Sequence, residues 1–338
     1  MEDMLDAADG EERVLVGGTF MVGQIEQTDM SWAPSVSILI CTYNRAELLR
    51  QTLLALEDVH EIEQAEVLVV DNNSQDHTEA VVQVCCQQLA HKVRLKYLFE
   101  ERQGLSAARN TGMLRSRAPI IAFLDDDAVP EHGWLRTLMQ SFKDFPDAGA
   151  VGGVIHPAFE NGRPDWLIRQ LEYPYAIINL GDQVQRYPRG LAPFGANMAV
   201  RRGAIGNLEF PENLGRKGAT LLSGEETYFF GHLRKKGWSL YYHPEMAVRH
   251  HIAAERLNIA WIRKRYYYQG VSIAMEGTSL LSRLRIVSSA LLRTVYASVQ
   301  WLLARGAGHR LHARCRLDSV RGTMTTLYQR RSAATGYE

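Results

Sequence analysis

Three successive carboxylates end an apolar run in the middle of the chain. Residues 120–124 are Ile-Ile-Ala-Phe-Leu, and Asp125, Asp126 and Asp127 follow directly. An uninterrupted apolar run is typical of a strand buried on both faces, and open α/β sheets bind ligands at the carboxyl ends of such strands. Adjacent carboxylates repel one another, and a divalent cation that prefers oxygen ligands, Mg²⁺ or Mn²⁺, compensates that repulsion. The pattern predicts a metal site, and the alternative is a solvated acidic turn.

A second carboxylate, Asp71, ends the apolar run of residues 67–70. A carboxylate at such a strand end can accept the imide N–H of a uracil or thymine ring. The alternative is an Asx turn formed with the two asparagines that follow. A dinucleotide site of the glycine-rich type is not expected, because residues 41–47, after the first predicted strand, contain no glycine.

The elements that must position these side chains alternate along the chain. Apolar runs at 36–41, 67–70 and 120–124 predict strands, residues 94–99 predict a further strand, and helical patterns at 46–57, 78–90 and around 107–110 separate them. Alternating strands and helices indicate a parallel sheet in an α/β fold. Further along, we expect a helix over 134–145 and strands at 149–155, 239–242 and 246–250. Between them, residues 223–226, which include Glu225 and Glu226, are expected to open a helix that runs to residue 236.

Six motifs in this order resemble those of the inverting glycosyltransferases of family 2, which have the nucleotide-diphospho-sugar transferase fold called GT-A. The motifs are Cys41-Thr42-Tyr43-Asn44-Arg45, Val70-Asp71-Asn72-Asn73-Ser74, the run from Gly104 to Gly112, Leu124-Asp125-Asp126-Asp127, Gly195-Ala196-Asn197 and Gly224-Glu225-Glu226. The resemblance covers about residues 36–251. It implies a mostly parallel central sheet flanked by helices, with a C-terminal helical appendage.

The resemblance also implies roles for individual residues. The metal, Mg²⁺ or Mn²⁺, is expected on Asp127, Asp125 and His250, with His251 as the register alternative to His250. The acceptor side is expected at Gly195, Asn197 and Trp166. The nucleotide-sugar is expected to contact the following residues: Thr42, Tyr43, Arg45, Asp71, Asn73, Arg109, Asp125 and Asp126.

The base that takes the proton of the acceptor hydroxyl is expected in the pair Glu225-Glu226. The family pattern has Glu-Asp here, so Glu226 is the first choice and Glu225 the alternative. Acidic residues at a helix N-terminus are also favoured by the helix dipole alone.

These roles predict a hexosyltransferase that moves a sugar from a UDP- or dTDP-activated donor to a hydroxyl acceptor (a glycan, a lipid-linked or a small molecule) by metal-assisted direct displacement. One alternative is a nucleotidyltransferase of related fold, although residues 42–45 lack the glycine- and lysine-rich loop that holds a triphosphate. The other is a non-catalytic sugar-nucleotide-binding module, which is expected to have lost one of these carboxylates.

Composition limits the partners and the compartment. Lys plus Arg equals Asp plus Glu at 38 each among 338 residues, so net charge suggests no nucleic-acid partner. Four cysteines without metal-ligand spacing and an N-terminus without a signal-peptide pattern predict a cytoplasmic protein. We expect an N-terminal extension (1–34), a catalytic domain (35–255, with a nucleotide-binding half at 35–130 and an acceptor half at 131–255) and a basic helical region (256–338).

Between Arg256 and Arg331 the basic helical region carries fourteen Lys and Arg residues against two acidic ones. Within it, apolar residues recur at helical spacing in one stripe, made up of Leu281, Leu284, Val287, Leu291, Val295, Val299 and Leu302. With the surrounding arginines, this stripe predicts peripheral contact with the inner face of a membrane, without crossing it. The alternative is that the stripe packs on the catalytic domain or on a second subunit, as in a homodimer.

Overall fold

The site-bearing half of the fold is a parallel sheet whose carboxyl ends meet at one edge. The computed structural model describes residues 32–218, 220–276 and 279–335, so nearly all of the predicted N-terminal extension lies outside the described residues. The strands are β1 (Val36–Thr42), β2 (Ala65–Asp71), β3 (Arg94–Phe99) and β4 (Ile120–Asp125). They pair in parallel in the order β3-β2-β1-β4. The helices between them are α1 (Ala46–Ala55), α2 (Thr78–Leu89) and α3 (Leu105–Arg115).

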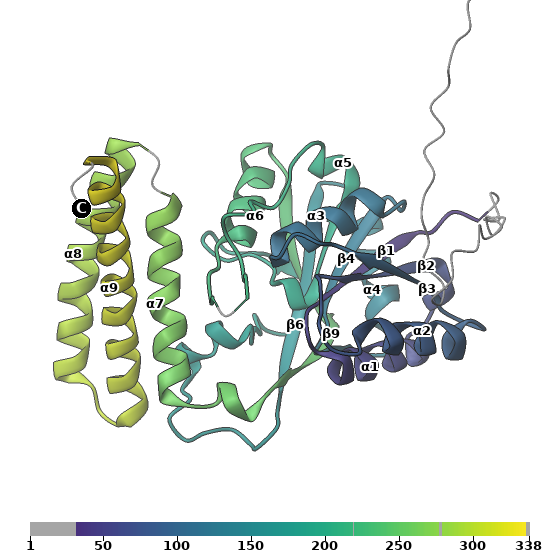
Figure 1. Ribbon diagram of the computed structural model, residues 1–338, viewed down its shortest axis with the longest axis horizontal. Helices are drawn as coiled ribbons and strands as arrows, with labels where there is room; N and C mark the ends of the chain where they lie inside the picture. Colours follow the sequence, from purple (N-terminus) through teal and green to yellow (C-terminus); the bar gives the residue numbers. More distant parts are fainter. Residues whose placement is uncertain (1–31, 219, 277–278, 336–338) are drawn as a thin grey trace, which may run out of the picture. The chain divides into compact units, whose positions relative to one another are not determined.

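These elements form because apolar residues follow the expected periods. All seven residues of β2 are buried, as a strand covered on both faces requires. Figure 1 shows α1 and α2 on one side of the sheet and α3 on the other. Helix α3 lies close to the sheet at Gly112, where an added Cβ would lie 2.9 Å from a methyl of Leu39. The carboxyl ends of β1 and β4, which carry Thr42 and Asp125, are therefore held side by side.

Beyond β4 the sheet becomes mixed. Its elements are β5 (Ala128–Pro130), α4 (Trp134–Asp144), β6 (Ala148–Phe159), β7 (Gln185–Arg186), β8 (Met198–Arg201), α5 (Arg202–Ile205), α6 (Glu225–Lys235) and β9 (Ser239–Ile252). Strand β8 pairs antiparallel with β4 and β6, whereas β6 and β9 are parallel. The parallel pairing predicted from the sequence is thus found in the first half of the sheet, β1 to β4.

Strand β9 corrects one prediction. The sequence predicted two strands, at 239–242 and 246–250, but a single strand runs from Ser239 to Ile252. His243 still pairs with Gly153 and Val248 with Ile155, so the strand absorbs residues 244–247 as an irregularity rather than a turn. Short 3₁₀ turns complete the chain at 56–58, 62–64, 169–171, 173–175, 195–197 and 254–256.

Three long helices follow the sheet: α7 (Ile259–Glu276), α8 (Leu280–Leu303) and α9 (Ala307–Thr335). Figure 1 shows α9 between α7 and α8. Helix α9 approaches α7 closely at Gly270, where an added Cβ would lie 1.8 Å from the carbonyl oxygen of Ser319. A small apolar cluster, separate from the main core, joins α7 and α9 to the sheet side: Leu167, Leu171, Tyr175, Ile252, Ile262, Tyr266, Leu311 and Cys315. The predicted appendage is therefore packed on the sheet-bearing part of the chain.

Candidate active site

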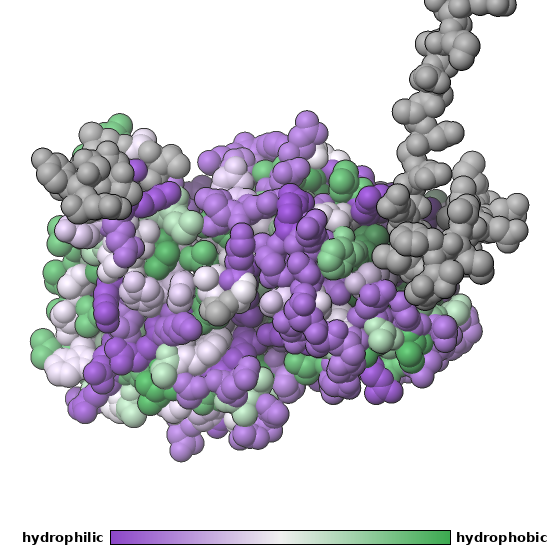
Figure 2. Space-filling model, viewed as in Figure 1, coloured by the Kyte–Doolittle hydropathy of each residue, from purple (hydrophilic) through white to green (hydrophobic). Residues whose placement is uncertain are grey.

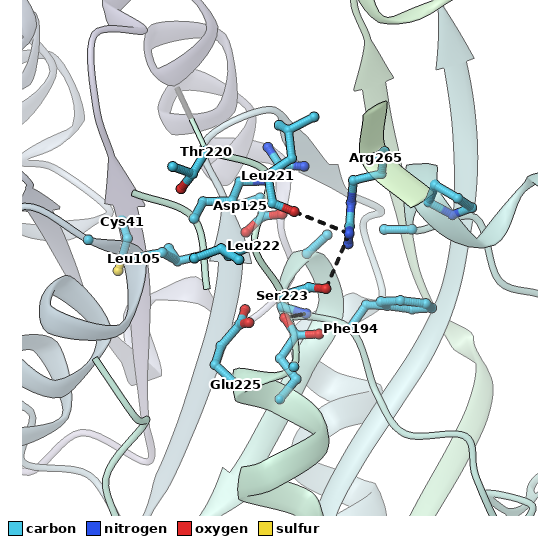
Figure 3. A pocket seen from close by; sticks show the side chains of 18 of the residues that line it. Cys41, Leu105, Asp125, Phe194, Thr220, Leu221, Leu222, Ser223, Glu225 and Arg265 are labelled. Carbon is cyan, nitrogen blue, oxygen red and sulfur yellow. Dashed lines mark hydrogen bonds between the residues drawn. The ribbon is translucent and has the colours of Figure 1, made fainter. Parts of the chain in front are cut away.

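A cavity of about 580 Å³ opens at the carboxyl ends of β1 and β4. Its wall combines the strand ends, the turn at 194–196, loop residues 216, 218 and 220–224, the start of α6 and one face of α7. Figure 3 shows Asp125, Glu225 and Arg265 around the same space, although they come from β4, α6 and α7. The predicted site residues Thr42, Tyr43 and Arg45 also line it.

One corner of the cavity gathers three metal-binding side chains. One ligand atom from each of Asp125, Asp127 and His250 lies within 4.8 Å of the others. Strand pairing explains this, because β5 places Ala128 opposite His250 on β9 immediately after the carboxylates. Of the two adjacent histidines, it is thus His250 that faces the carboxylates, while His251 lines a separate, smaller hollow.

The imidazole of His250 is oriented by the backbone. Its Nδ1 lies 3.0 Å from the carbonyl oxygen of Tyr175, an acceptor, so this nitrogen carries a proton. In the neutral ring Nε2 then carries a lone pair and no proton, and this atom lies 3.1 Å from Oδ1 of Asp127. Two acceptor atoms facing each other at this distance are stabilised by a cation between them or by a second proton on the ring. The imidazole, oriented by the backbone carbonyl, and the two carboxylates together form a set of ligands that fits Mg²⁺ or Mn²⁺.

Protein cations already approach these carboxylates. Arg45 Nη1 lies 3.0 Å from Asp126 Oδ1 and 2.9 Å from Asp127 Oδ2. Burial raises the pKa of Asp126 to about 6, against the effect of Arg45. Burial acts in the same direction on Asp127, but His250, Arg45 and Arg256 outweigh it and hold the pKa of Asp127 below its ordinary value. Of Asp126 and Asp127, it is therefore Asp127 whose ionised form is favoured, as a metal ligand requires.

The opposite corner holds the two glutamates at the start of α6. Glu226 Oε1 accepts a hydrogen bond from the amide of Gly195 at 2.8 Å and one from Arg109 Nη2 at 3.1 Å. Arg109 Nη1 lies 3.2 Å from Glu225 Oε1. The Glu226 side chain is 21% exposed and that of Glu225 only 7%. Burial raises the pKa of Glu226 to about 7, more than Arg109 lowers it. Glu226 is thus the more accessible of the two and is able to take up a proton near neutral pH.

Arg109, which was predicted to contact the nucleotide-sugar, lines the cavity. Its guanidinium is buried, bridges both glutamates and lies 5.3 Å from the ring centre of Phe210. An added Cβ on Gly195 would lie 1.9 Å from Arg109 Nη2, so only glycine leaves room for this bridge. Arg109 therefore positions the two glutamates.

Comparison with known proteins identifies the family. The family model described as glycosyl transferase family 2 matches residues 37–208, about half of the chain. The chain belongs to glycosyl transferase family 2.

Relatives and a solved structure agree with this. The chain is 28% identical over 244 residues to a succinoglycan biosynthesis protein, ExoM, of Rhizobium meliloti, covering 70% of this chain and 72% of that one. It is 26% identical over 251 residues to a glucosyl-dolichyl phosphate glucuronosyltransferase of Haloferax volcanii, covering 70% and 75%. The fold matches the mannosyltransferase PcManGT of Pyrobaculum calidifontis, solved with GDP-Man and Mn²⁺, at a TM-score of 0.59, with 17% identity and 88% of each chain covered. The predicted GT-A fold and hexosyltransferase class are thereby confirmed.

Two arginines of this glycosyltransferase were missed by the sequence analysis. Arg256 Nη1 lies 3.7 Å from Asp127 Oδ2, and its guanidinium lies 5.1 Å from the ring centre of Trp261. Arg265 Nη1 lies 3.3 Å from the Leu221 carbonyl oxygen and 3.2 Å from Ser223 Oγ, as Figure 3 shows. Burial lowers the pKa of each guanidinium to about 10. Among the ion pairs of the described residues none involves Arg265, and the glutamates Glu225 and Glu226 attract its charge only from a longer distance.

A sequence signal for Arg265 existed. Residues Trp261, Arg265, Gln269, Ser272, Ile273 and Glu276 all line the cavity. They recur at three- and four-residue steps along α7, which is the spacing of one helix face. The boundary predicted between the catalytic domain and the basic helical region, at 255/256, separates residues that line the same cavity. The division of the chain into domains stays a prediction.

Several predicted site residues lie beside the cavity rather than in its wall. Asp71 is buried, with Oδ1 accepting from the Ser74 amide and Oδ2 from the Tyr97 hydroxyl, both at 2.9 Å. Asn73 has a positive φ of 65° and donates from Nδ2 to the Glu101 carbonyl, as a turn residue does. The neighbouring Asn72, which was not predicted, lines the cavity instead.

The acceptor-side predictions divide in the same way. Gly195 lines the cavity, whereas Asn197 is fully buried and bonds to Trp134 Nε1, the Val154 carbonyl and the Met246 carbonyl. Trp166 packs against the small apolar cluster and also lies outside the lining. The aromatic wall is formed by Tyr173 and Phe194, whose ring centres are 4.8 Å apart.

Proposed function

We propose that this family 2 enzyme transfers a hexosyl group from a UDP- or dTDP-activated donor to a hydroxyl acceptor with inversion at the anomeric carbon. The observation that supports this most strongly is that Glu226 and the group of Asp125, Asp127 and His250 open into one cavity from different sides. Direct displacement needs a base on the acceptor side and charge stabilisation on the leaving-group side. Family membership favours this reading over nucleotidyl transfer or simple binding.

The leaving diphosphate belongs at the corner of Asp127 and Arg256. Asp125, Asp127 and His250 would hold the divalent cation, Mg²⁺ or Mn²⁺, which supplies Lewis-acid stabilisation of the departing diphosphate oxygens. Arg45 and Arg256 add fixed positive charge beside it. The Arg256 side chain is only 7% exposed, so it needs little reorganisation as negative charge grows on the leaving group, whereas that of Arg45 is 33% exposed.

The acceptor hydroxyl belongs near Glu226. Its oxygen forms the bond to the anomeric carbon, the bond from that carbon to the diphosphate oxygen breaks, and the hydroxyl proton passes to the Glu226 carboxylate. Attack from the face opposite the leaving group inverts the anomeric centre. The Gly195 amide and Arg109 fix Oε1 of Glu226, which leaves Oε2 to receive the proton.

The nucleotide base belongs at the end of β2. Each Asp71 oxygen accepts one hydrogen bond within the protein and keeps a lone pair for the imide N–H of uracil or thymine. Thr42, Tyr43 and Asn72 line the adjoining wall. Glycans, lipid-linked and small-molecule hydroxyls are all retained as acceptor classes, and the relative named for a dolichyl phosphate substrate supports the lipid-linked class.

A donor-hydrolysis screen tests the proposal. UDP-, dTDP- and GDP-hexoses are incubated with the enzyme in Mn²⁺, in Mg²⁺ or with a chelator, and released nucleotide is measured. We expect turnover of a UDP- or dTDP-sugar only with a metal. Preference for a GDP-sugar would overturn the donor assignment, and full activity in the chelator would overturn the metal assignment.

A further inference from the structure

The outer face of α8 is rich in large apolar side chains from one end of the helix to the other, with Arg285, Ser288, Ser289 and Ser298 exposed among them. Ten large apolar side chains of this helix are each between 47% and 75% exposed: Leu281, Leu284, Leu291, Leu292, Val295, Tyr296, Val299, Trp301, Leu302 and Leu303. Figure 2 shows apolar atoms along the margin of the molecule where Figure 1 places α8. Most residues of the predicted stripe are among them, so the stripe does not pack on the catalytic part of the chain. An apolar face of this size needs an occupant.

The inner face of the same helix has the opposite character. Small residues, Ala290 and Ala297, are buried there, and α8 makes its main contact with α9. Arg316 of α9 donates to the Gln300 side chain at 3.3 Å and lies 4.6 Å from the ring centre of Tyr296. A helix with small residues inside and large apolar residues outside is the reverse of one on a water-exposed surface.

The charge around this face is of one sign. Residues 277–317 contain seven arginines, no lysine and no acidic residue. Arg285 shares the exposed side of α8 with the apolar residues, and Arg305, Arg310 and Arg314 follow on exposed positions. The aromatic side chains Tyr296 and Trp301, which favour the boundary between lipid and water, lie towards one end of the helix.

We propose that α8 docks this enzyme on an anionic lipid surface, with its outer face buried at the level of the lipid headgroups. The arginines complement anionic headgroups, and the apolar face enters the boundary of the acyl chains. A second copy of the chain fits less well, because two such faces would bring arginines together without an acidic partner in this segment. This docking is independent of which donor the enzyme uses.

The helix lies along the surface and does not cross the membrane. By length and composition Leu281–Leu303 is sufficient to cross. However, α8 is packed along α9, which carries Arg310, Arg314 and Arg316 and has no continuous apolar face. Crossing would either carry these arginines into the hydrocarbon or remove α8 from α9. Lying flat keeps both the α8–α9 contact and the exposed apolar face satisfied.

Vesicle flotation of the full-length protein tests the docking. The probes are phosphatidylcholine vesicles with and without about 30% phosphatidylglycerol, at low and high salt. The double variant Leu291→Glu/Val295→Glu places two carboxylates on the outer face. The control Leu114→Glu makes the same change at an 82% exposed leucine on α3. Donor hydrolysis in the absence of vesicles is measured for each protein to confirm folding.

We expect the wild type and Leu114→Glu to float with anionic vesicles at low salt and to be released by salt or by carbonate at high pH. The double variant should bind about tenfold less or weaker still. Wild-type protein that ignores anionic vesicles, or a double variant that binds as well as the control, would overturn the proposal. A dimer that only the double variant dissociates would assign the face to a second copy, and retention in carbonate would indicate crossing.

Discussion

Nε2 of His250 faces Oδ1 of Asp127 at 3.1 Å, with no proton between them when the ring is neutral. The only proton of the neutral ring is on Nδ1, which donates a hydrogen bond to the carbonyl oxygen of Tyr175. Strand pairing sets the distance, since β5 and β9 run side by side here. The contact therefore has to be relieved by a cation or by protonation of the imidazole, and this distinction can be measured.

The metal assignment predicts a stability effect that is separate from catalysis. Mn²⁺ should raise the melting temperature of the wild type, because a ligand that binds only the folded state stabilises it. At a concentration of about 100 times Kd the gain is about 2.7 kcal/mol, or several degrees for a chain of this size. Asp127→Asn should abolish the shift, as measured by differential scanning calorimetry with Mn²⁺ and with chelator.

The matched control is Asp58→Asn, which changes an exposed carboxylate away from the cavity. It should keep the full Mn²⁺ shift. An Asp127→Asn protein that is stabilised by Mn²⁺ as much as Asp58→Asn would show that the cation binds elsewhere.

The two glutamates should differ when each loses its charge. Glu226→Gln keeps an oxygen to accept from Gly195 and Arg109 but cannot take a proton, so transfer should fall by about 10²- to 10⁴-fold. Donor binding, measured by calorimetry, should remain close to wild type, because Glu226 lies on the acceptor side.

Glu225→Gln is the control for this pair, since its side chain is more buried and also contacts Arg109. Its effect on transfer should be clearly smaller. If transfer falls further in Glu225→Gln than in Glu226→Gln, the base is Glu225 and not Glu226.

The pKa of Glu226 predicts the pH dependence of transfer. Burial raises this pKa from its ordinary value to about 7, so the carboxyl is protonated and inactive as a base below that pH. The value of kcat/KM should therefore increase about tenfold per pH unit below 7 and level off above it. The residual activity of Glu226→Gln should not show this increase of kcat/KM with pH. If the increase persists unchanged in the variant, the titrating group is a residue other than Glu226.

The sequence was sufficient where function depends on strand ends. Asp125, Asp127 and Thr42 follow apolar runs whose parallel pairing brings their carboxyl ends to one edge, so local pattern and topology predict that they meet. Helices α1 to α4 were also predictable, because each shows helical periodicity and follows a polar turn.

The remainder depends on packing that no local pattern encodes. Asn197 was expected in the acceptor wall, but it is buried because Trp134 and two backbone carbonyls need its amide. Arg265 was assigned to a separate basic region, because helical spacing marks one face of α7 but does not show that this face covers the strand ends. For α8, periodicity gave the apolar stripe correctly but not the partner that it faces.

The contact between α7 and α9 gives a last prediction, because the cavity wall depends on it. At Gly270 an added Cβ would lie 1.8 Å from the Ser319 carbonyl oxygen, so Gly270→Ala must separate the two helices. We expect a loss of about 1–3 kcal/mol in the free energy of unfolding. Gly231→Ala is the matched control within α6, where the new methyl meets nothing within 4 Å. Replacing a glycine inside a helix there should stabilise the protein by about 0.5–1 kcal/mol.

Urea denaturation followed by circular dichroism measures both changes, and donor hydrolysis measured below the transition reports on the cavity. Because Arg265 and Gln269 line the cavity from the same helix as Gly270, displacement of α7 should slow hydrolysis in Gly270→Ala while Gly231→Ala keeps the wild-type rate. Equal stability of the two variants would contradict the close approach of α7 to α9. A destabilised Gly270→Ala protein with undiminished hydrolysis would instead show that the position of α7 does not control the site.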